Sequence, residues 1–221
     1  MKLWSSLSFY RNLQSRFVLT IMESWLYRWI LRKIIQYVRF SFYYTSMRGQ
    51  SYLQGYSVLR PGDIILSRDN WKLSSFLIPG DLVHAALCVG KSDAGASFEV
   101  AEMVGTGYRR SEFYDICHES DRVVILRCKD WDNAYLSQVI DTCLSFEGTN
   151  YDIKFELGIK TLYCSELIVA SDPEKRLQVS YADLIGIGRP YISPMGIYAA
   201  NNVKVAWDSK VEQLCQAIKN K

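Results

Sequence analysis

Histidine is scarce in this chain, and one of its two histidines lies where a general base would be useful. His118 belongs to the polar stretch 117–122, which we interpret as a solvated loop. His84 instead interrupts the apolar segment 81–90, a predicted strand. An imidazole can take and return protons near neutral pH once a neighbouring group orients it. His84 is therefore the candidate base.

A carboxylate lies within reach of His84 if two neighbouring strands form a hairpin. Segment 97–104 is a second predicted strand, and the loop 91–96 separates it from the first. An antiparallel hairpin centred on Asp93 places Glu102 opposite His84, with Cβ atoms about 4.5–5.5 Å apart. Glu102 shares its face with apolar side chains, so its charge needs a partner. The pair is either a base with its orienting acid or a buried pair that satisfies itself.

Cys164 is the candidate nucleophile among six cysteines. It precedes the apolar segment 167–170 at the start of a predicted helix, where backbone N–H groups and the helix dipole lower a thiol pKa and supply oxyanion donors. Cys88 lies ~13 Å from His84 along its strand, and Cys117 adjoins His118 in the predicted loop. The others are interpreted as packed hydrophobes: Cys128, Cys143 and Cys215.

These three side chains must be brought together by an α+β domain. The turn at 60–63 leads into a predicted strand, and a helix with apolar residues at three- and four-residue steps ends before Gly148. We predict an antiparallel sheet packed against helices. Besides the hairpin, the predicted elements are strands at 64–66 and 122–128, an edge strand at 203–207, and a helix within 130–146.

Composition excludes several classes of protein. The 221 residues are 49% hydrophobic and 14% aromatic, which excludes a disordered or collagen-like chain. A net charge of +3 gives no reason to predict nucleic-acid binding. No apolar run reaches the ~18 residues of a spanning helix. The cysteines show no C-x-x-C pair and no zinc-ligand spacing, so we predict a reducing, cytoplasmic location, with a cleaved secretory signal disfavoured.

Charge divides the chain into two parts. Residues 1–50 hold eight basic side chains and one acidic one, a net charge of +7, whereas residues 51–221 carry a net charge of −4. Within the first part, 15–44 has no Gly or Pro and predicts a basic helix with a Trp- and Ile-rich face. Such a helix suits a membrane surface or a partner groove, or it packs on its own domain. Met22 is a second candidate start of the chain.

The order and local motifs of these residues resemble the circularly permuted papain-like enzymes of the NlpC-type and lecithin-retinol-acyltransferase-like superfamily, in particular the YiiX/YebB-like branch. The resemblance covers about residues 59–207. The matching segments are Pro61–Ile65, Val83–Leu87 with the base, Glu102–Gly105 with the acid, Gly148–Asp152, Tyr163–Glu166 with the nucleophile, and the step Ser193–Pro194.

The resemblance implies a cysteine hydrolase of the amidase or peptidase type that acts through a thioacyl-enzyme. Cys164 would attack, His84 would move the proton, and Glu102 would orient His84. No cofactor or metal is implied, and the expected substrate is a small peptide or an acyl or lipid amide. Tyr163, Arg109 and Arg110 are candidate substrate contacts. The alternatives are an acyltransferase or thioesterase on lipids and a non-catalytic, membrane-anchored binding module.

Overall fold

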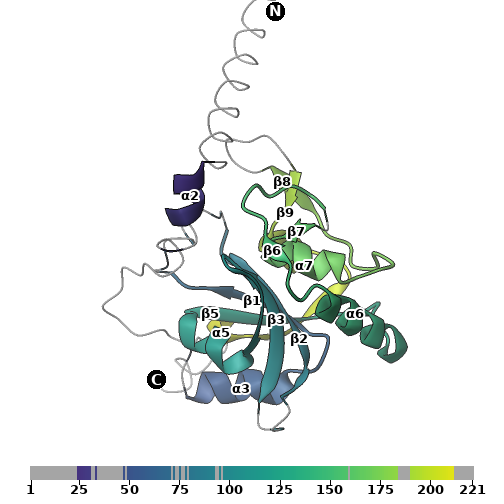
Figure 1. Cartoon of the computed structure of the whole chain (residues 1–221). Helices are drawn as coiled ribbons and strands as arrows, with labels where there is room; N and C mark the ends of the chain where they lie inside the picture. The colour runs from purple at the N-terminus through teal and green to yellow at the C-terminus, as the bar shows by residue number, and fades with distance from the viewer. Residues whose placement is uncertain are drawn as a thin grey trace, which may run out of the picture.

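The computed structural model describes residues 24–30, 33, 47, 49–70, 72, 75, 78, 80–92, 95, 97–158, 160–183 and 190–211. Its helices are α2 (Trp25–Ile30), α3 (Gln50–Val58), α5 (Phe113–Glu119), α6 (Asn133–Ser145), α7 (Cys164–Ala170) and α8 (Pro194–Tyr198). Its strands are β1 (Ile64–Arg68), β2 (His84–Lys91), β3 (Phe98–Val104), β4 (Gly107–Glu112), β5 (Arg122–Cys128), β6 (Asn150–Tyr151), β7 (Thr161–Leu162), β8 (Tyr181–Asp183), β9 (Pro190–Ile192) and β10 (Val203–Asp208). Figure 1 shows their arrangement.

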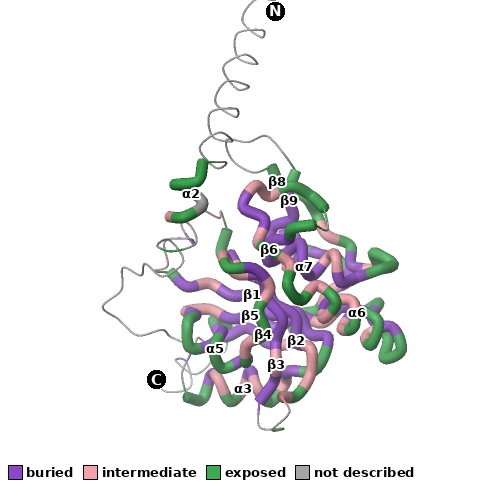
Figure 2. The backbone as a smooth tube through the Cα atoms, in the orientation of Figure 1, coloured by how far each residue is buried: buried purple, intermediate pink, exposed green. Residues whose placement is uncertain are grey.

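A six-stranded antiparallel sheet in the order β10-β5-β1-β2-β3-β4 forms the centre of the domain. Both of its faces are covered. Ile64 and Leu66 belong to one buried cluster and Ile65 to the other, because successive side chains of a strand point to opposite faces. This explains why the strands read as continuous apolar runs, and Figure 2 shows the central strands as mostly buried.

Helices cover the sheet on both sides. α6 and α7 contribute to the cluster that contains Leu87 and Leu126, whereas α3 and α5 lie with the cluster that contains Ile125 and Trp207. The antiparallel sheet packed against helices is as predicted, and β10 is an edge strand. α6 begins three residues later than the predicted range because the Asp132 side chain accepts hydrogen bonds from the N–H groups of Ala134 and Tyr135 and caps it there.

The predicted register of the β2–β3 hairpin is wrong by two residues. Glu102 lies opposite Ala86 rather than His84, because the pairs that align it are centred on position 94 instead of on Asp93; a bulge between Cys88 and Gly90 shifts the register again toward the tip. A displacement of two residues keeps every side chain on its predicted face. His84 and Glu102 are consequently diagonal neighbours on one face of the sheet.

The first half of the stretch 117–122, predicted as a solvated loop around His118, is instead helical. Cys117 and His118 belong to α5, and Cys117 is buried against the sheet. A capping box starts this helix: the Glu112 N–H donates to the Asp115 carboxylate at 3.0 Å. The exposed His118 ring stacks on Tyr114, and His118 is not part of the predicted triad.

Only part of the predicted N-terminal arm lies within the described residues. α2 is helical, in agreement with the prediction for its six residues, but most of 15–44 lies outside them. Met47 packs into the cluster around Phe113, so the body of the domain includes residues just before α3. Among the described residues, none of the helices is long and apolar enough to cross a membrane.

The helix that carries Cys164 has a buried carboxyl group in its first turn. Glu166 is 4% exposed; one of its oxygens accepts a hydrogen bond from the Gly158 N–H at 2.7 Å, and the other has no hydrogen-bond partner among the described residues. Burial, with the nearby charge of Asp152, raises the pKa of Glu166 from 4.5 to about 7. An ionised Glu166 is therefore costly to the folded state.

Replacing this carboxyl group should change how stability depends on pH. In the unfolded chain Glu166 ionises near its ordinary value of 4.5, so the folded state loses stability as the pH rises from about 4.5 to about 7. Glu166→Gln removes this loss. When the pH is raised from about 5 to about 8, we therefore expect the free energy of unfolding of the variant to increase by roughly 1–3 kcal/mol relative to that of wild type. Urea unfolding at the two pH values measures the difference.

The matched control is Glu174→Gln, because Glu174 is an exposed partner of Arg176. It should change the free energy of unfolding by no more than about 0.5 kcal/mol at either pH. Parallel stability curves for wild type and Glu166→Gln would contradict the assignment of a raised pKa to Glu166.

Candidate active site

The three residues predicted to do chemistry come from three elements and meet at one place. His84 is the first residue of β2, Glu102 lies in β3, and Cys164 is the first residue of α7. The His84 Nε2–H donates to Glu102 Oε2 at 2.6 Å. The Cys164 sulfur lies 4.0 Å from the carbonyl oxygen of Val83, the residue before His84, and His84 and Cys164 each shift the pKa of the other. Because Nε2 is occupied by Glu102, Nδ1 is the nitrogen available to the thiol.

Burial and charge favour an ion pair between the thiol and the imidazole. Burial opposes a charge on His84, but its hydrogen bonds with Cys164 and Glu102 outweigh that effect and raise its pKa to about 10. Burial likewise opposes a thiolate, yet the hydrogen bond and positive charge of His84 lower the pKa of Cys164. The arrangement therefore favours a thiolate beside an imidazolium.

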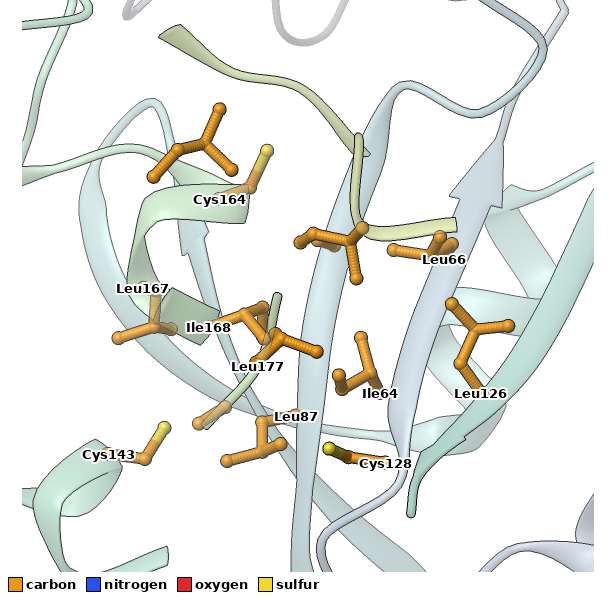
Figure 3. Close-up of a cluster of buried hydrophobic side chains, with 14 of the residues drawn as sticks. Ile64, Leu66, Leu87, Leu126, Cys128, Cys143, Cys164, Leu167, Ile168 and Leu177 are labelled. Carbon is orange, nitrogen blue, oxygen red and sulfur yellow. The ribbon is translucent and has the colours of Figure 1, made fainter. Parts of the chain in front are cut away.

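The position of Cys164 supports the charged form of its sulfur. The backbone N–H groups of Ala85 and Ser165 also lower the pKa of the Cys164 thiol. Figure 3 shows the Cys164 sulfur at the end of α7, pointing away from Leu167 and Ile168 on the same helix. Cys164 itself is 3% exposed, whereas the His84 side chain is 26% exposed, so solvent meets the cluster at the imidazole.

The other described cysteines have the opposite electrostatic character. Burial raises the pKa of Cys88 to about 12 and that of Cys143 to about 11, and it also raises the pKa of Cys117 and Cys128. All four are buried and free, as expected for packed hydrophobes. Cys215 lies outside the described residues.

Glu102 is held on its second oxygen by two side chains of β4 that the sequence analysis did not place. Arg109 donates from Nη2 at 2.7 Å and from Nε at 3.1 Å to Glu102 Oε1, and the Ser111 hydroxyl donates to the same oxygen. The carboxylate is only 3% exposed. Although burial opposes its charge, His84, Arg109 and Ser111 together lower the pKa of Glu102 far below its usual range.

A signal for this contact is present in the sequence. Val104 pairs with Gly107, so Gly105 and Thr106 form a two-residue hairpin loop, and a glycine at the first loop position followed by a second glycine after the loop is a strong turn signal. That register places Arg109 directly opposite Glu102. Gly107 has φ +114°, and a Cβ there would lie 2.7 Å from the Thr149 carbonyl oxygen, so this turn requires glycine.

The predicted substrate contacts occupy different environments. Tyr163 is 1% exposed, its ring packs on Phe155, and its hydroxyl accepts a hydrogen bond from the Ile192 N–H at 2.8 Å. It has almost no free surface, and its contact with a substrate stays a prediction. Arg109 pairs with Glu102 and Arg110 with Glu99, and both guanidinium groups remain about half exposed. Their contact with a substrate stays a prediction.

Tyr151 packs against the buried cluster that contains Cys164. The Tyr108 N–H donates to the Thr149 carbonyl at 2.9 Å, which fixes the start of the segment around Tyr151 on β4. Burial, followed by the charge of Cys164, raises the pKa of Tyr151 well above 10.0. The phenol therefore stays neutral beside the sulfur, and the sequence offered its motif, 148–152, without indicating this contact.

A hollow of about 460 Å³ lies elsewhere. It is lined by the 60–63 turn, Trp131 and part of α6, at the end of β1 remote from Ser67, the residue that pairs with His84. None of the three candidate catalytic residues lines it, so it is not part of this site.

Comparison with known proteins agrees with the fold and with the family predicted from the motifs. Residues 58–208 match the sequence model described as the permuted papain-like amidase enzyme, YaeF/YiiX, C92 family. The crystal structure of the metalloprotein YiiX from Escherichia coli O157:H7 is similar in fold, with a TM-score of 0.55 and 16% identity over 66% of this chain and 95% of that one. No curated protein matches the chain.

YiiX is described as a metalloprotein, but the described residues of this chain do not form a metal site. Within those residues, no group of three or more His, Cys, Asp or Glu side chains is placed to hold a metal ion. His84 and Glu102 instead satisfy each other, and Arg109 occupies the remaining oxygen of the carboxylate.

The family match spans more than half of the chain and includes all three candidate residues, so the YiiX-like branch predicted from the motifs is confirmed. NlpC-type enzymes form a related but different branch. The fold and the family together support a cysteine-hydrolase type of function. The chain belongs to the YaeF/YiiX family of permuted papain-like amidases.

Proposed function

We propose that this protein is a cysteine amidase in which Cys164, His84 and Glu102 act as a catalytic triad. The observation that carries the proposal is the chain of contacts from the Arg109-held Glu102, through His84, to a thiol whose pKa is lowered. Each contact favours charge where the reaction needs it. A pair that merely satisfies itself would not require a thiol at the third position.

The proposed reaction uses these residues in two half-reactions. The Cys164 thiolate attacks the substrate carbonyl carbon, and the developing oxyanion accepts hydrogen bonds from nearby backbone N–H groups. His84 then gives its proton to the leaving amine as the C–N bond breaks, which leaves a thioacyl-enzyme. A water molecule loses a proton to His84 and attacks the thioester, and the acid product departs as the thiol is restored. Glu102 holds the imidazole and stabilises its charged form throughout.

An acyltransferase or thioesterase is the alternative within the same chemistry. The acyltransferase differs in the acceptor that discharges the thioacyl-enzyme, whereas the thioesterase differs in the bond cleaved, a thioester in place of an amide. Mixing the protein with p-nitrophenyl acetate and measuring the intact mass would show an acetyl group on the chain. Rapid discharge by water supports the hydrolase, whereas discharge that depends on an added amine or alcohol supports the transferase.

Selective alkylation tests the low pKa of Cys164. At about pH 6, iodoacetamide should modify Cys164 at least about tenfold faster than any other cysteine, because the thiolate is the reactive form and burial raises the pKa of the four other described thiols. Peptide mass spectrometry after timed quenching measures each site. Cys143→Ala should leave the rate unchanged, and Cys164→Ala should abolish the fast phase. Uniform slow labelling of all six cysteines would favour the non-catalytic binding module.

A substitution of Arg109, whose guanidinium holds Glu102, tests the acid of the triad. Arg109→Gln removes the positive charge at Glu102, so the pKa of that carboxyl should rise and the imidazolium should lose support at low pH. We expect the acidic limb of the alkylation profile of Cys164 to move upward by roughly one pH unit. Arg109→Lys should recover part of the shift, since it restores the charge without the two-point hydrogen bond.

Arg110→Gln is the matched control for this experiment. Arg110 is the adjacent residue, equally exposed, and its guanidinium pairs with Glu99 instead. Its alkylation profile should coincide with that of wild type. Equal profiles for Arg109→Gln and wild type, with circular dichroism showing both folded, would remove Arg109 from the proposed mechanism.

A further inference from the structure

α2 carries an unusual surface for so short a helix. Trp25, Leu26 and Trp29 are 76%, 56% and 45% exposed, so half of its six residues are large apolar side chains in contact with solvent. Trp25 and Trp29 are four residues apart and therefore neighbours on the helix surface. Figure 2 shows the described part of α2 as mostly exposed. Other exposed large apolar side chains are spread singly over separate elements.

Charge in the same part of the sequence indicates what this surface contacts. Residues 1–50 have a net charge of +7, and the remainder of the chain has a net charge of −4. Tryptophan prefers the boundary between water and acyl chains, and nearby basic residues add roughly 1 kcal/mol each at an anionic lipid surface. A purely acidic protein partner would match the charge but would leave the two indole rings without an apolar environment.

Tyr27 differs from its neighbours on α2. It is partly buried, and burial raises its pKa, whereas Trp25 and Leu26 face solvent. α2 therefore has one less exposed side and one apolar side in contact with solvent, which is the arrangement of a helix that lies on a membrane surface.

We propose that the surface formed by Trp25, Leu26 and Trp29 binds an anionic lipid membrane and so holds the candidate active site at the membrane surface. The position of the site, and hence its access to substrates in or on the bilayer, rests on the proposed function. The lipid-binding surface itself rests only on exposure and charge.

Vesicle flotation with the full chain tests the surface. Wild type should float with phosphatidylcholine vesicles that contain about one third phosphatidylserine, and much less with phosphatidylcholine alone. The triple variant Trp25→Ser, Leu26→Ser and Trp29→Ser should lose at least about tenfold in bound fraction. The control Leu53→Ser with Val205→Ser removes side chains that are 56% and 48% exposed on α3 and β10, and it should bind like wild type.

Three results would overturn the proposal: no flotation of wild type, equal flotation of the triple variant, or equal binding to both kinds of vesicle. A wild-type dimer that the triple variant converts to monomer, without vesicle binding, would show that a second copy covers the surface. Lipids brominated on their acyl chains provide a second readout. They should quench the fluorescence of wild type more than that of Trp25→Phe with Trp29→Phe, a variant that keeps an apolar surface.

Alkylation of Cys164 in the same samples separates this proposal from the proposed function. Fast alkylation together with lost flotation in the triple variant leaves both intact. Flotation of wild type without fast alkylation keeps the surface and removes the catalytic thiol. Fast alkylation without flotation of wild type does the reverse.

Discussion

A buried carboxylate is the constraint around which this site is built. Glu102 is 3% exposed, and an unpaired charge at that depth would cost several kcal/mol. Its two oxygens are therefore divided between an imidazole on one side and a guanidinium with a hydroxyl on the other. Three adjacent strands are needed to supply these groups. The order β2-β3-β4 is thus an electrostatic requirement as well as a packing arrangement.

The alternation of side chains along the sheet both packs the sheet against helices and positions the buried carboxylate. Along β3, Val100 and Glu102 share a face, and Ala101 and Met103 occupy the other. The apolar members bind the sheet to helices on both sides, and the polar member lies close to where β2 begins. α7 packs on β2 and β3 and brings its first residue, Cys164, to the first residue of β2, His84. The candidate catalytic residues therefore lie where the run of buried apolar side chains in the sheet ends.

Much of this could be predicted from the sequence, and the limits have physical reasons. Apolar runs gave β1, β2, β3 and β5, because strands buried on both faces are continuous hydrophobic segments. The predicted register was wrong by two residues, because a displacement by an even number of residues leaves every side chain on the same face of the sheet, and the apolar pattern cannot distinguish such displacements. The three candidate residues could be selected because the chain has only two histidines to act as a base and because Cys164 is the cysteine predicted to lie at the start of a helix.

β4 and α5 show why the rest could not be predicted. β4 has little apolar character because Arg109 and Ser111 serve the buried charge of Glu102, so a search for hydrophobic alternation passes over it. α5 is only two turns long, and its polar exposed side, including His118, resembles a loop. The N-terminal region was predicted from charge and periodicity, neither of which determines what a helix packs against.

The bulge in β2 has a consequence for how the hairpin can vary. It lies between Cys88 and Gly90, on the side of the ladder that leads to the tip, whereas Glu102 is aligned by the regular pairs nearer His84. A bulge accommodates one extra residue in a strand without changing the pairing on its other side, so a change of register near the tip does not move the pairs near His84. Insertions or deletions at the tip of this hairpin would then be taken up locally, so the loop is free to diversify while the proton-transfer geometry is inherited unchanged.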